Sequence, residues 1–210
     1  MNFITRYAHV RNRTLFRQGD VVYRNSEGNL DFFLESAFQA LSTGYSKFYK
    51  MDPSSKLGFL GAEMVLHNLV LRELYKPEQV ALVLANAHGS LDTDIRYFES
   101  TKTMASPALF VYTLPNIVAG EVCIRHGIKG ENAFFVWPAF DAMQMYQYVE
   151  MVMASEKTQA CLSGWVDVMG EHHDVFLYLT EKQEKVNALG HSAVQLQKLY
   201  QAKDYGTVNG

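Results

Sequence analysis

The sequence lacks the features that mark several common classes of protein. It has two cysteines in 210 residues, and Cys123 and Cys161 lie far apart, without metal-ligand spacing. We therefore expect free thiols in a reducing compartment, the cytoplasm, with no metal site and no cofactor. Nineteen Lys and Arg against 22 Asp and Glu give a formal net charge of -3. Because nucleic-acid binding needs clustered positive charge, we expect no nucleic-acid partner.

Long apolar runs are also missing. The uncharged stretch 104–120 contains Pro107 and Pro115 and falls short of the roughly 20 apolar residues that a membrane-spanning helix needs. The first ten residues lack the apolar core of a signal peptide. With 48% hydrophobic residues, the sequence predicts one substantial buried core and no membrane span.

What the sequence does contain is an alternation of helical and covered-strand patterns. Asp52 and Pro53 are typical of a helix start, because the carboxylate accepts hydrogen bonds from unpaired amides and proline lacks an amide that would need a partner. The apolar pattern that follows predicts one helix that continues through Leu71 until Pro77 stops it. Residues 80–85 form a short apolar run, as in a strand covered on both faces.

The remaining segments follow the same two patterns. We expect irregular structure over 1–30 with a short edge strand at 21–23, helices over 31–43, 114–127, 140–156 and 181–201, a buried strand over 133–137, strands over 160–168 and 175–179, and a frayed end over 206–210. Helices that alternate with covered strands predict an α/β layer fold with parallel strands joined by crossovers.

Three stretches resemble the β-ketoacyl synthases of the thiolase superfamily. The stretch from Phe48 to Glu63 resembles the family's F-x-x-M-D … K-L-x-x-x-A-x-E helix. The most specific runs from Ser106 to Asn132 and resembles S-P … L-P-N-x-x-A-G-x-V-x-I-R-x-G-x-x-G-P-N. Residues 160–167 are similar to an A-L-A-G-G-x-D strand. The resemblance covers residues 48–170 and is strongest to short ketosynthase-like proteins of aryl-polyene and flexirubin-type pigment clusters.

This resemblance implies half of a thiolase-like fold, a mixed sheet covered by helices on both faces. It divides the chain into an N-terminal irregular segment and short helix over 1–47, a ketosynthase N-terminal-half-like domain over 48–180, and a C-terminal helix and tail over 181–210.

The sequence departs from the family at the nucleophile. The family's catalytic cysteine lies seven residues after the asparagine of its G-P-N motif, and counting from Asn132 leads to Ala139. Alanine offers no thiolate to attack an acyl thioester. The family's supporting histidines and lysine lie in the second half of the fold, and we expect this sequence to end before that half begins. The resemblance therefore implies a pseudoenzyme with no catalytic residues.

Other reactive side chains fit structural roles better. Cys161 enters a strand after a helix, the reverse of a nucleophile elbow, and Cys123 occupies a small-residue position in a helix, so both predict inert packing. Adjacent His172 and His173 would point to opposite faces of a strand, which favours a solvated turn over a metal site.

Two further patterns leave an alternative open. His88, Gly89 and Ser90 could be imagined as a hydrolase site with the nearby acids Asp92 and Asp94, but no elbow surrounds the serine, so a loop is favoured. Methionines and tyrosines over 143–153 predict core and interface packing, with a docking surface for an acyl chain or a partner as the alternative.

Sequence and resemblance together predict a non-catalytic β-ketoacyl-synthase-like accessory subunit, similar to chain-length factors, in fatty-acid or polyene biosynthesis. A lone half of the fold would expose an apolar face, and such faces mark interfaces. We expect a homodimer or a complex with a complete ketosynthase, with acyl carrier protein as a further partner. The alternative is an enzyme similar to 3-oxoacyl-carrier-protein synthases that processes acyl thioesters at an unrecognised site. A structural dimer without a ligand is the third interpretation.

The expected substrate-binding or interface residues fall in two segments. Trp137 and Phe140 flank the degenerate position Ala139, and Asn116, Gly120 and Arg125 belong to the helical stretch that we expect to form the uncovered layer. A charge placed in that stretch, as in Val122→Asp, would then break association and lower stability together.

Overall fold

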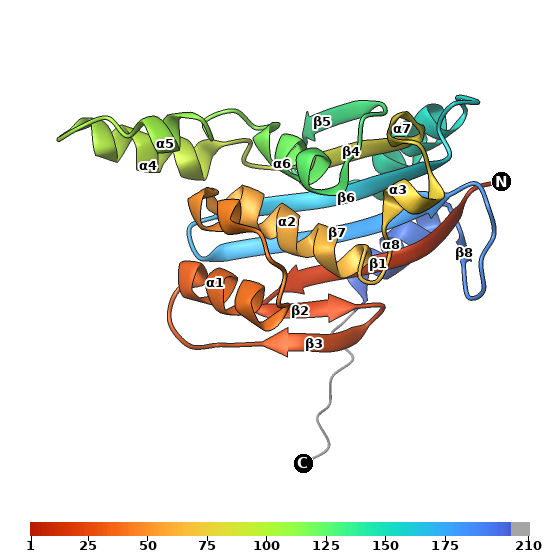
Figure 1. Ribbon diagram of the computed structural model, residues 1–210, viewed down its shortest axis with the longest axis horizontal. Helices are drawn as coiled ribbons and strands as arrows, with labels where there is room; N and C mark the ends of the chain where they lie inside the picture. The colour runs from red at the N-terminus through yellow and green to blue at the C-terminus, as the bar shows by residue number, and fades with distance from the viewer. Residues whose placement is uncertain (203–210) are drawn as a thin grey trace, which may run out of the picture.

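A mixed sheet forms the centre of the protein, and the computed structural model describes residues 1–202 (Figure 1). The strands are β1 (Phe3–Arg11), β2 (Thr14–Arg17), β3 (Asp20–Arg24), β4 (Val80–Asn86), β5 (Asn132–Val136), β6 (Ala160–Met169), β7 (His172–Glu181) and β8 (Leu189–Gly190). They lie in the order β3-β2-β1-β7-β6-β4-β5, and β8 pairs beside β1. Strand β4 is parallel to β5 and β6, and the other pairs are antiparallel.

Helices cover both faces of this sheet, as predicted. One face carries α1 (Leu30–Ala40), α2 (Pro53–Val65), α3 (Leu71–Leu74) and α6 (Ile117–His126), and the other carries α7 (Ala142–Met153) and α8 (Ala193–Gln201). Two short 3-10 helices, η1 (Ser46–Lys50) and η2 (Pro77–Gln79), connect elements. Helices α4 (Leu91–Thr101) and α5 (Pro107–Phe110) extend beyond the sheet, at the left of Figure 1.

Strand β4 shows why a continuous apolar run forms a strand here. All seven of its residues are buried. Leu82 and Leu84 contribute to the core beneath α2, whereas Val83 and Ala85 contribute to the core beneath α7, because successive side chains of a strand point to opposite faces. The prediction of a strand covered on both faces is confirmed.

Helix α2 is buried around most of its circumference. The Asp52 side chain accepts a hydrogen bond from the Ser55 amide at 3.0 Å, which confirms the predicted helix start. The helix ends at Val65, well before Pro77, so the predicted end is wrong. A Cβ atom at Gly58 would lie 2.3 Å from a methyl group of Val118, and glycine therefore allows α2 and α6 to approach closely.

The N-terminal segment differs from the prediction. Residues 1–30 are not irregular, because β1, β2 and β3 occupy most of them. The predicted edge strand at 21–23 is confirmed within β3, at one end of the sheet. Charged residues interrupt the alternating apolar pattern by which β1 could be identified in the sequence. Arg6 donates to the His67 carbonyl at 2.7 Å and Arg11 pairs with Asp174 at 2.5 Å, partners that lie far along the chain.

The C-terminal segment is also only partly as predicted. Residue 181 ends β7 and does not begin a helix, and α8 begins only after Ser192, whose side chain accepts from the Gln195 amide at 3.2 Å. The strand predicted over 133–137 exists as β5, but it lies at the sheet edge and is only partly buried. The elements predicted over 31–43, 114–127, 140–156, 160–168 and 175–179 are confirmed. The predicted frayed end, 206–210, lies outside the described residues.

Among residues 1–202, no helix has both the length and the hydropathy that crossing a membrane would require.

Candidate partner interface

The turn between β5 and α7 holds the residue that the resemblance places at the nucleophile position. Strand β5 ends at Val136, and Asp141 caps α7 by accepting from the amides of Met143 and Gln144, both at 2.9 Å. A turn from a strand into a helix is where a nucleophile elbow presents its reactive group. Ala139 is exposed in this turn, and its methyl group offers no nucleophile.

The two aromatic residues of this turn pack inside the chain. Trp137 is buried and stacks on Phe135 with ring centroids 5.4 Å apart. Phe140 stacks on Tyr200 at 4.2 Å and meets Phe176 edge-on at 5.6 Å. Both side chains therefore anchor the turn on the α7 and α8 side of the sheet.

The other three predicted site residues lie on α6, across the sheet. Asn116 is the exposed N-cap residue of α6, and a Cβ atom at Gly120 would have no neighbour within 4 Å among the described atoms. Arg125 pairs with Glu63 at 2.6 Å. The structure therefore divides the five predicted residues between two faces of the sheet and does not bring them together in one pocket.

The expectation that Val122 lies on an uncovered helical layer is wrong. Val122 is 1% exposed and packs in the core shared with α2. Val118 and Ala119 are buried in the same core. A Val122→Asp substitution would therefore disrupt this chain's own core and would not probe an interface.

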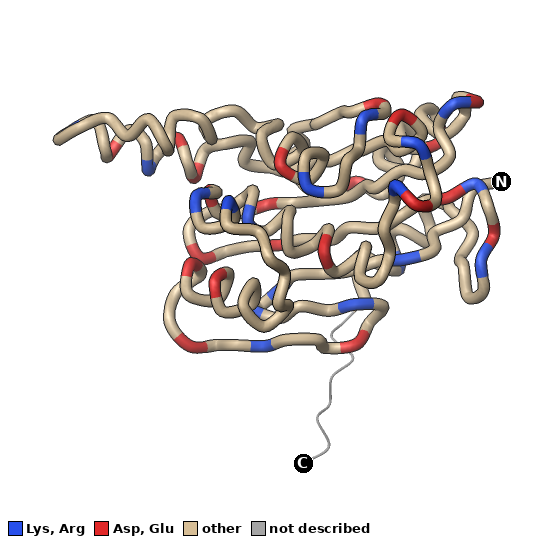
Figure 2. The backbone as a smooth tube through the Cα atoms, in the orientation of Figure 1, with Lys and Arg blue, Asp and Glu red and all other residues tan. Residues whose placement is uncertain are grey.

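The exposed apolar surface lies instead on the projecting segment 91–114, which we call the arm (Figure 1). Phe98 is 63% exposed, Met104 81% and Phe110 60%. Leu91, Ile95, Val111 and Leu114 are exposed on the same segment. Figure 2 shows no charged residue in the part of the arm that follows Lys102. Contiguous apolar surface of this kind marks an interaction site.

Hydrogen bonds hold the base of the arm to the body. Thr93 donates to Asp52 at 2.7 Å, and the Gly170 amide donates to Asp92 at 2.8 Å. Asp52 thus caps α2 with one carboxylate oxygen and anchors α4 with the other. The arm is therefore fixed at its base while its apolar tip faces solvent.

Strand β5 extends the same surface. It pairs with β4 on one side, and among the described residues no strand pairs with its other side. The Trp137 amide donates to the Asn86 carbonyl at 2.9 Å. Since amide directions alternate along a strand, the preceding amide, of Val136, points away from β4. An unpaired strand edge readily accepts another strand.

A groove of about 360 Å³ runs beside this edge, between β5 and α7. Phe135, Tyr148 and Met151 supply much of its apolar lining. The open end of β5 also approaches the base of the arm, because a Cβ atom at Gly89 would touch both Pro115 and Val136. The arm, the β5 edge and the groove therefore form one continuous rim of the molecule.

A histidine–aspartate pair lies at the C-terminal end of β4. His88 Nδ1 is 3.0 Å from both carboxylate oxygens of buried Asp167, which also accepts from the amides of Ala87 and His88 at 3.0 and 3.1 Å. The His88 side chain is 37% exposed. Ser90 is within hydrogen-bond distance of Asp94 and the Thr113 carbonyl, not of His88. The serine therefore has no histidine partner, which agrees with the loop interpretation.

The predictions for the cysteines are confirmed and that for the paired histidines is wrong. Cys161 is fully buried and burial raises its thiol pKa to about 12, while burial raises the pKa of Cys123 to about 11. His172 and His173 begin β7 and do not form a solvated turn, because buried His173 stacks on Phe33 at 5.9 Å. Among residues 1–202, no three His, Cys, Asp or Glu side chains are placed to hold a metal ion.

Comparisons with known proteins give the fold. No family model matches the chain, and no curated protein matches it by sequence. The ishigamide ketosynthase/chain length factor structure matches with a TM-score of 0.64 at 15% identity, over 89% of this chain and 63% of that chain. A β-ketoacyl synthase from Burkholderia phymatum STM815 matches with a TM-score of 0.56 at 13% identity, over 87% of this chain and 59% of that one.

The chain therefore has the thiolase-like fold of ketosynthases, as the resemblance implied, and spans less than two thirds of the length of both these structures. A third match covers most of both chains. The structure of the ketosynthase ApeO in complex with its chain length factor ApeC, from Xenorhabdus doucetiae, matches with a TM-score of 0.56 at 12% identity, over 95% of this chain and 90% of that chain.

Sequence reasoning missed the arm and the histidine–aspartate pair. The uncharged stretch 104–120 was the available signal for the arm, because prolines and missing charge together indicate an exposed apolar segment that is no membrane helix. No local signal joins His88 to Asp167, which lie 79 residues apart.

Proposed function

We propose that this protein is a non-catalytic ketosynthase-like subunit, similar to chain-length factors, that pairs with a complete ketosynthase in fatty-acid or polyene biosynthesis. The observation that carries this proposal is the rim formed by the arm, the β5 edge and the groove. It is open and apolar, and it lies next to the strand-to-helix turn that holds Ala139, the residue at the position that the resemblance assigns to the nucleophile.

The match to the ApeO–ApeC structure supports the same proposal. This chain corresponds to 90% of the matched chain, which belongs to a complex of a ketosynthase with its chain length factor. A chain of similar length and fold thus occurs in a complex of a ketosynthase with its chain length factor. We take a complete ketosynthase as the occupant of the rim, with its own edge strand pairing against β5 and the arm packing on its surface.

The test is complex formation measured by light scattering after mixing with a complete ketosynthase from the same organism. Phe98→Asp and Phe110→Asp should each weaken association at least tenfold, because a carboxylate would be desolvated in an apolar contact. Val136→Pro should act similarly, since it removes an outward amide without breaking the β4 ladder. Val21→Asp is the matched control, because Val21 is 40% exposed on β3, at the opposite end of the sheet from β5.

Each outcome has a defined meaning. Loss of the complex in the arm and edge variants, with the Val21 variant unchanged, supports the proposal. A complex that tolerates all three rim substitutions would contradict the assigned surface. A stable homodimer that excludes the ketosynthase would contradict the assigned partner and favour self-association through the same rim.

Acyl carrier protein is a further expected partner. A neighbouring structure, that of AntDE:AntF, contains an acyl-carrier protein in complex with its ketosynthase, and it matches this chain with a TM-score of 0.55 at 15% identity, over 87% of this chain and 62% of that chain. We propose that a carrier protein binds the assembled pair and not the free subunit. Binding of carrier protein to the isolated chain with the same affinity as to the pair would contradict this.

The His88–Asp167 pair favours a second candidate, acyl-thioester hydrolysis. Asp167 orients the imidazole through Nδ1, which leaves Nε2 as the free ring nitrogen. Nε2 would accept a proton from water as the water oxygen attacks the thioester carbonyl, and would return it to the departing thiol as the carbon–sulfur bond breaks. Acyl-pantetheine turnover that disappears in His88→Gln would support this enzyme. Absence of turnover by the wild type would dismiss it.

A further inference from the structure

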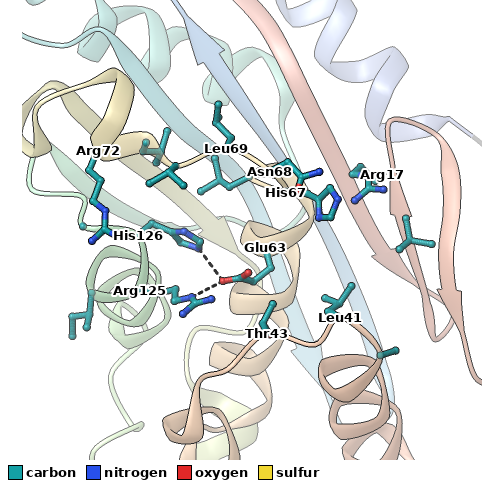
Figure 3. Close-up of a pocket in the computed structure, with 17 residues that line it drawn as sticks. Arg17, Leu41, Thr43, Glu63, His67, Asn68, Leu69, Arg72, Arg125 and His126 are labelled. Atoms are coloured by element: carbon teal, nitrogen blue, oxygen red, sulfur yellow. Dashed lines mark hydrogen bonds and ion pairs between the residues drawn. The ribbon is translucent and has the colours of Figure 1, made fainter.

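A cavity of about 800 Å³ opens on the α2 face of the sheet (Figure 3). The C-terminal ends of α2 and α6, the start of α3 and the β2–β3 hairpin surround it. It shares no lining residue with the groove beside β5. Its volume lies within the usual range for small-molecule sites.

Two arginines line this cavity without a partner. Within residues 1–202, neither the Arg17 nor the Arg72 guanidinium makes a hydrogen bond or an ion pair, and Figure 3 shows them reaching the cavity from different sides. Glu63 is the single acidic residue among the described lining residues, and Arg125 already neutralises it at 2.6 Å. The cavity is therefore positively charged in a chain whose formal net charge is -3.

The pKa of His67, a lining residue, is consistent with this positive charge. Desolvation and then the charges of Arg17 and Arg6 lower the pKa of His67, which lines the cavity beside Arg17. Burial also lowers the pKa of His126 to about 4, so this side chain is neutral at pH 7 and does not add to the charge. The two unpaired guanidinium groups thus dominate the field in the cavity.

The rest of the lining is aliphatic. Val22, Val70 and Ile124 are exposed large hydrophobic residues, and all three line this one cavity. Single exposed aliphatic residues are ordinary on a protein surface. Three of them around one concavity that also holds two unpaired guanidinium groups give the mixture of apolar wall and few polar anchors found in ligand sites.

We propose that this cavity binds a small anionic amphiphile, with an oxyanion head group, carboxylate or phosphate, attracted by Arg17 and Arg72 and an aliphatic chain against Val22, Val70 and Ile124. Guanidinium groups favour both oxyanions because their planar fork pairs with two oxygens. If only one of the two arginines contacts the head group directly, the other still attracts it through the positive electrostatic potential of the cavity. This inference stands apart from the proposed pairing with a ketosynthase, because it uses a different part of the molecule.

The test is isothermal titration calorimetry of the full chain with four probes. Octanoate and octyl phosphate carry both head group and chain, and the tighter of the two identifies the preferred oxyanion. Octanol lacks the charge, and inorganic phosphate lacks the chain. We expect octanol and inorganic phosphate to bind at least tenfold more weakly than the better of the two complete probes.

Variants locate the binding. Arg17→Gln and Arg72→Gln should each weaken the better probe several-fold and the double variant should abolish it, while Ile124→Ser should weaken it by the loss of apolar contact. Arg24→Gln is the matched control, because Arg24 lies on the adjacent strand, bonds to Thr14 and does not line the cavity. Unfolding curves verify that the variants fold, as expected for arginines without partners.

Three results would overturn the proposal. The first is no binding of either complete probe by the wild type. The second is equal affinity for octanol and for the complete probes. The third is binding that the Arg17 and Arg72 double variant retains at the level of the Arg24 control, because the probe would then bind elsewhere.

Discussion

Gly164 in β6 offers the sharpest test of the packing between the two long central strands. Its φ is +145°, a backbone conformation that residues with side chains rarely adopt. A Cβ atom there would lie 2.0 Å from the Phe176 carbonyl oxygen and 3.0 Å from the Leu177 Cα atom. Both neighbours are backbone of β7, so neither can rotate away as a side chain would.

The expected loss of stability in Gly164→Ala follows from these two terms. An unfavourable backbone region costs about 1–3 kcal/mol, and forcing an extra methyl group into a packed core costs about 1–3 kcal/mol more. Their sum, about 2–6 kcal/mol, is a large fraction of the roughly 5–15 kcal/mol that stabilises a typical domain. We expect the variant to unfold at much lower urea concentration, or to fail to accumulate as folded protein.

Gly120→Ala provides the matched control. Gly120 lies inside α6, and a Cβ atom there would meet nothing within 4 Å among the described atoms. Alanine is favoured over glycine in a helix by roughly 0.5–1 kcal/mol, so this variant should be slightly more stable than the wild type. Urea unfolding followed by circular dichroism measures both. Equal stability of the two variants would refute the close contact between β6 and β7 at Gly164.

Three further predictions use the same unfolding assay or a thiol assay. Asp52→Ala should lower the free energy of unfolding by about 1–3 kcal/mol, because it removes the cap of α2 and leaves Thr93 without its acceptor. Asp52→Asn should recover part of this stability. An alanine variant as stable as the wild type would contradict the double role of Asp52. Burial lowers the pKa of His9 to about 3, so below pH 6.5 the unfolded chain takes up a proton that the folded chain does not. The free energy of unfolding should therefore decrease as the pH is lowered, by about 2 kcal/mol at pH 5. A His9→Asn variant with the same dependence of stability on pH would contradict this. In Cys123→Ser, the remaining thiol of fully buried Cys161 should not react with Ellman's reagent until denaturant is added.

The sequence predicted the elements whose signals are local. The run 80–85 identified β4 because both faces of that strand meet apolar cores, and the Asp52–Pro53 pair identified the start of α2 because capping depends on neighbouring residues. The position of Ala139 in a turn after β5 follows from an equally local pattern of strand and helix.

Features that depend on distant partners were not predictable in this way. Strand β1 carries Arg6 and Arg11, whose partners lie 61 and 163 residues away, so its apolar alternation is interrupted. Val122 resembles an interface residue in the sequence because nothing local reveals that α2 covers it. The pairing of His88 with Asp167 likewise exists only once β4 and β6 lie side by side.

The position of β1 has a consequence for how the chain is synthesised. This strand lies between β2 and β7, and its register with β7 joins Phe3 to Glu181. During synthesis β1 therefore cannot gain its second neighbour until β7, far along the chain, has been translated. Non-local pairing of this kind slows folding, and a strand edge left open for so long is prone to aggregate. Expression at low temperature or with a chaperone should raise the soluble yield for this reason, and a chain interrupted before β7 should be recovered mainly as insoluble material.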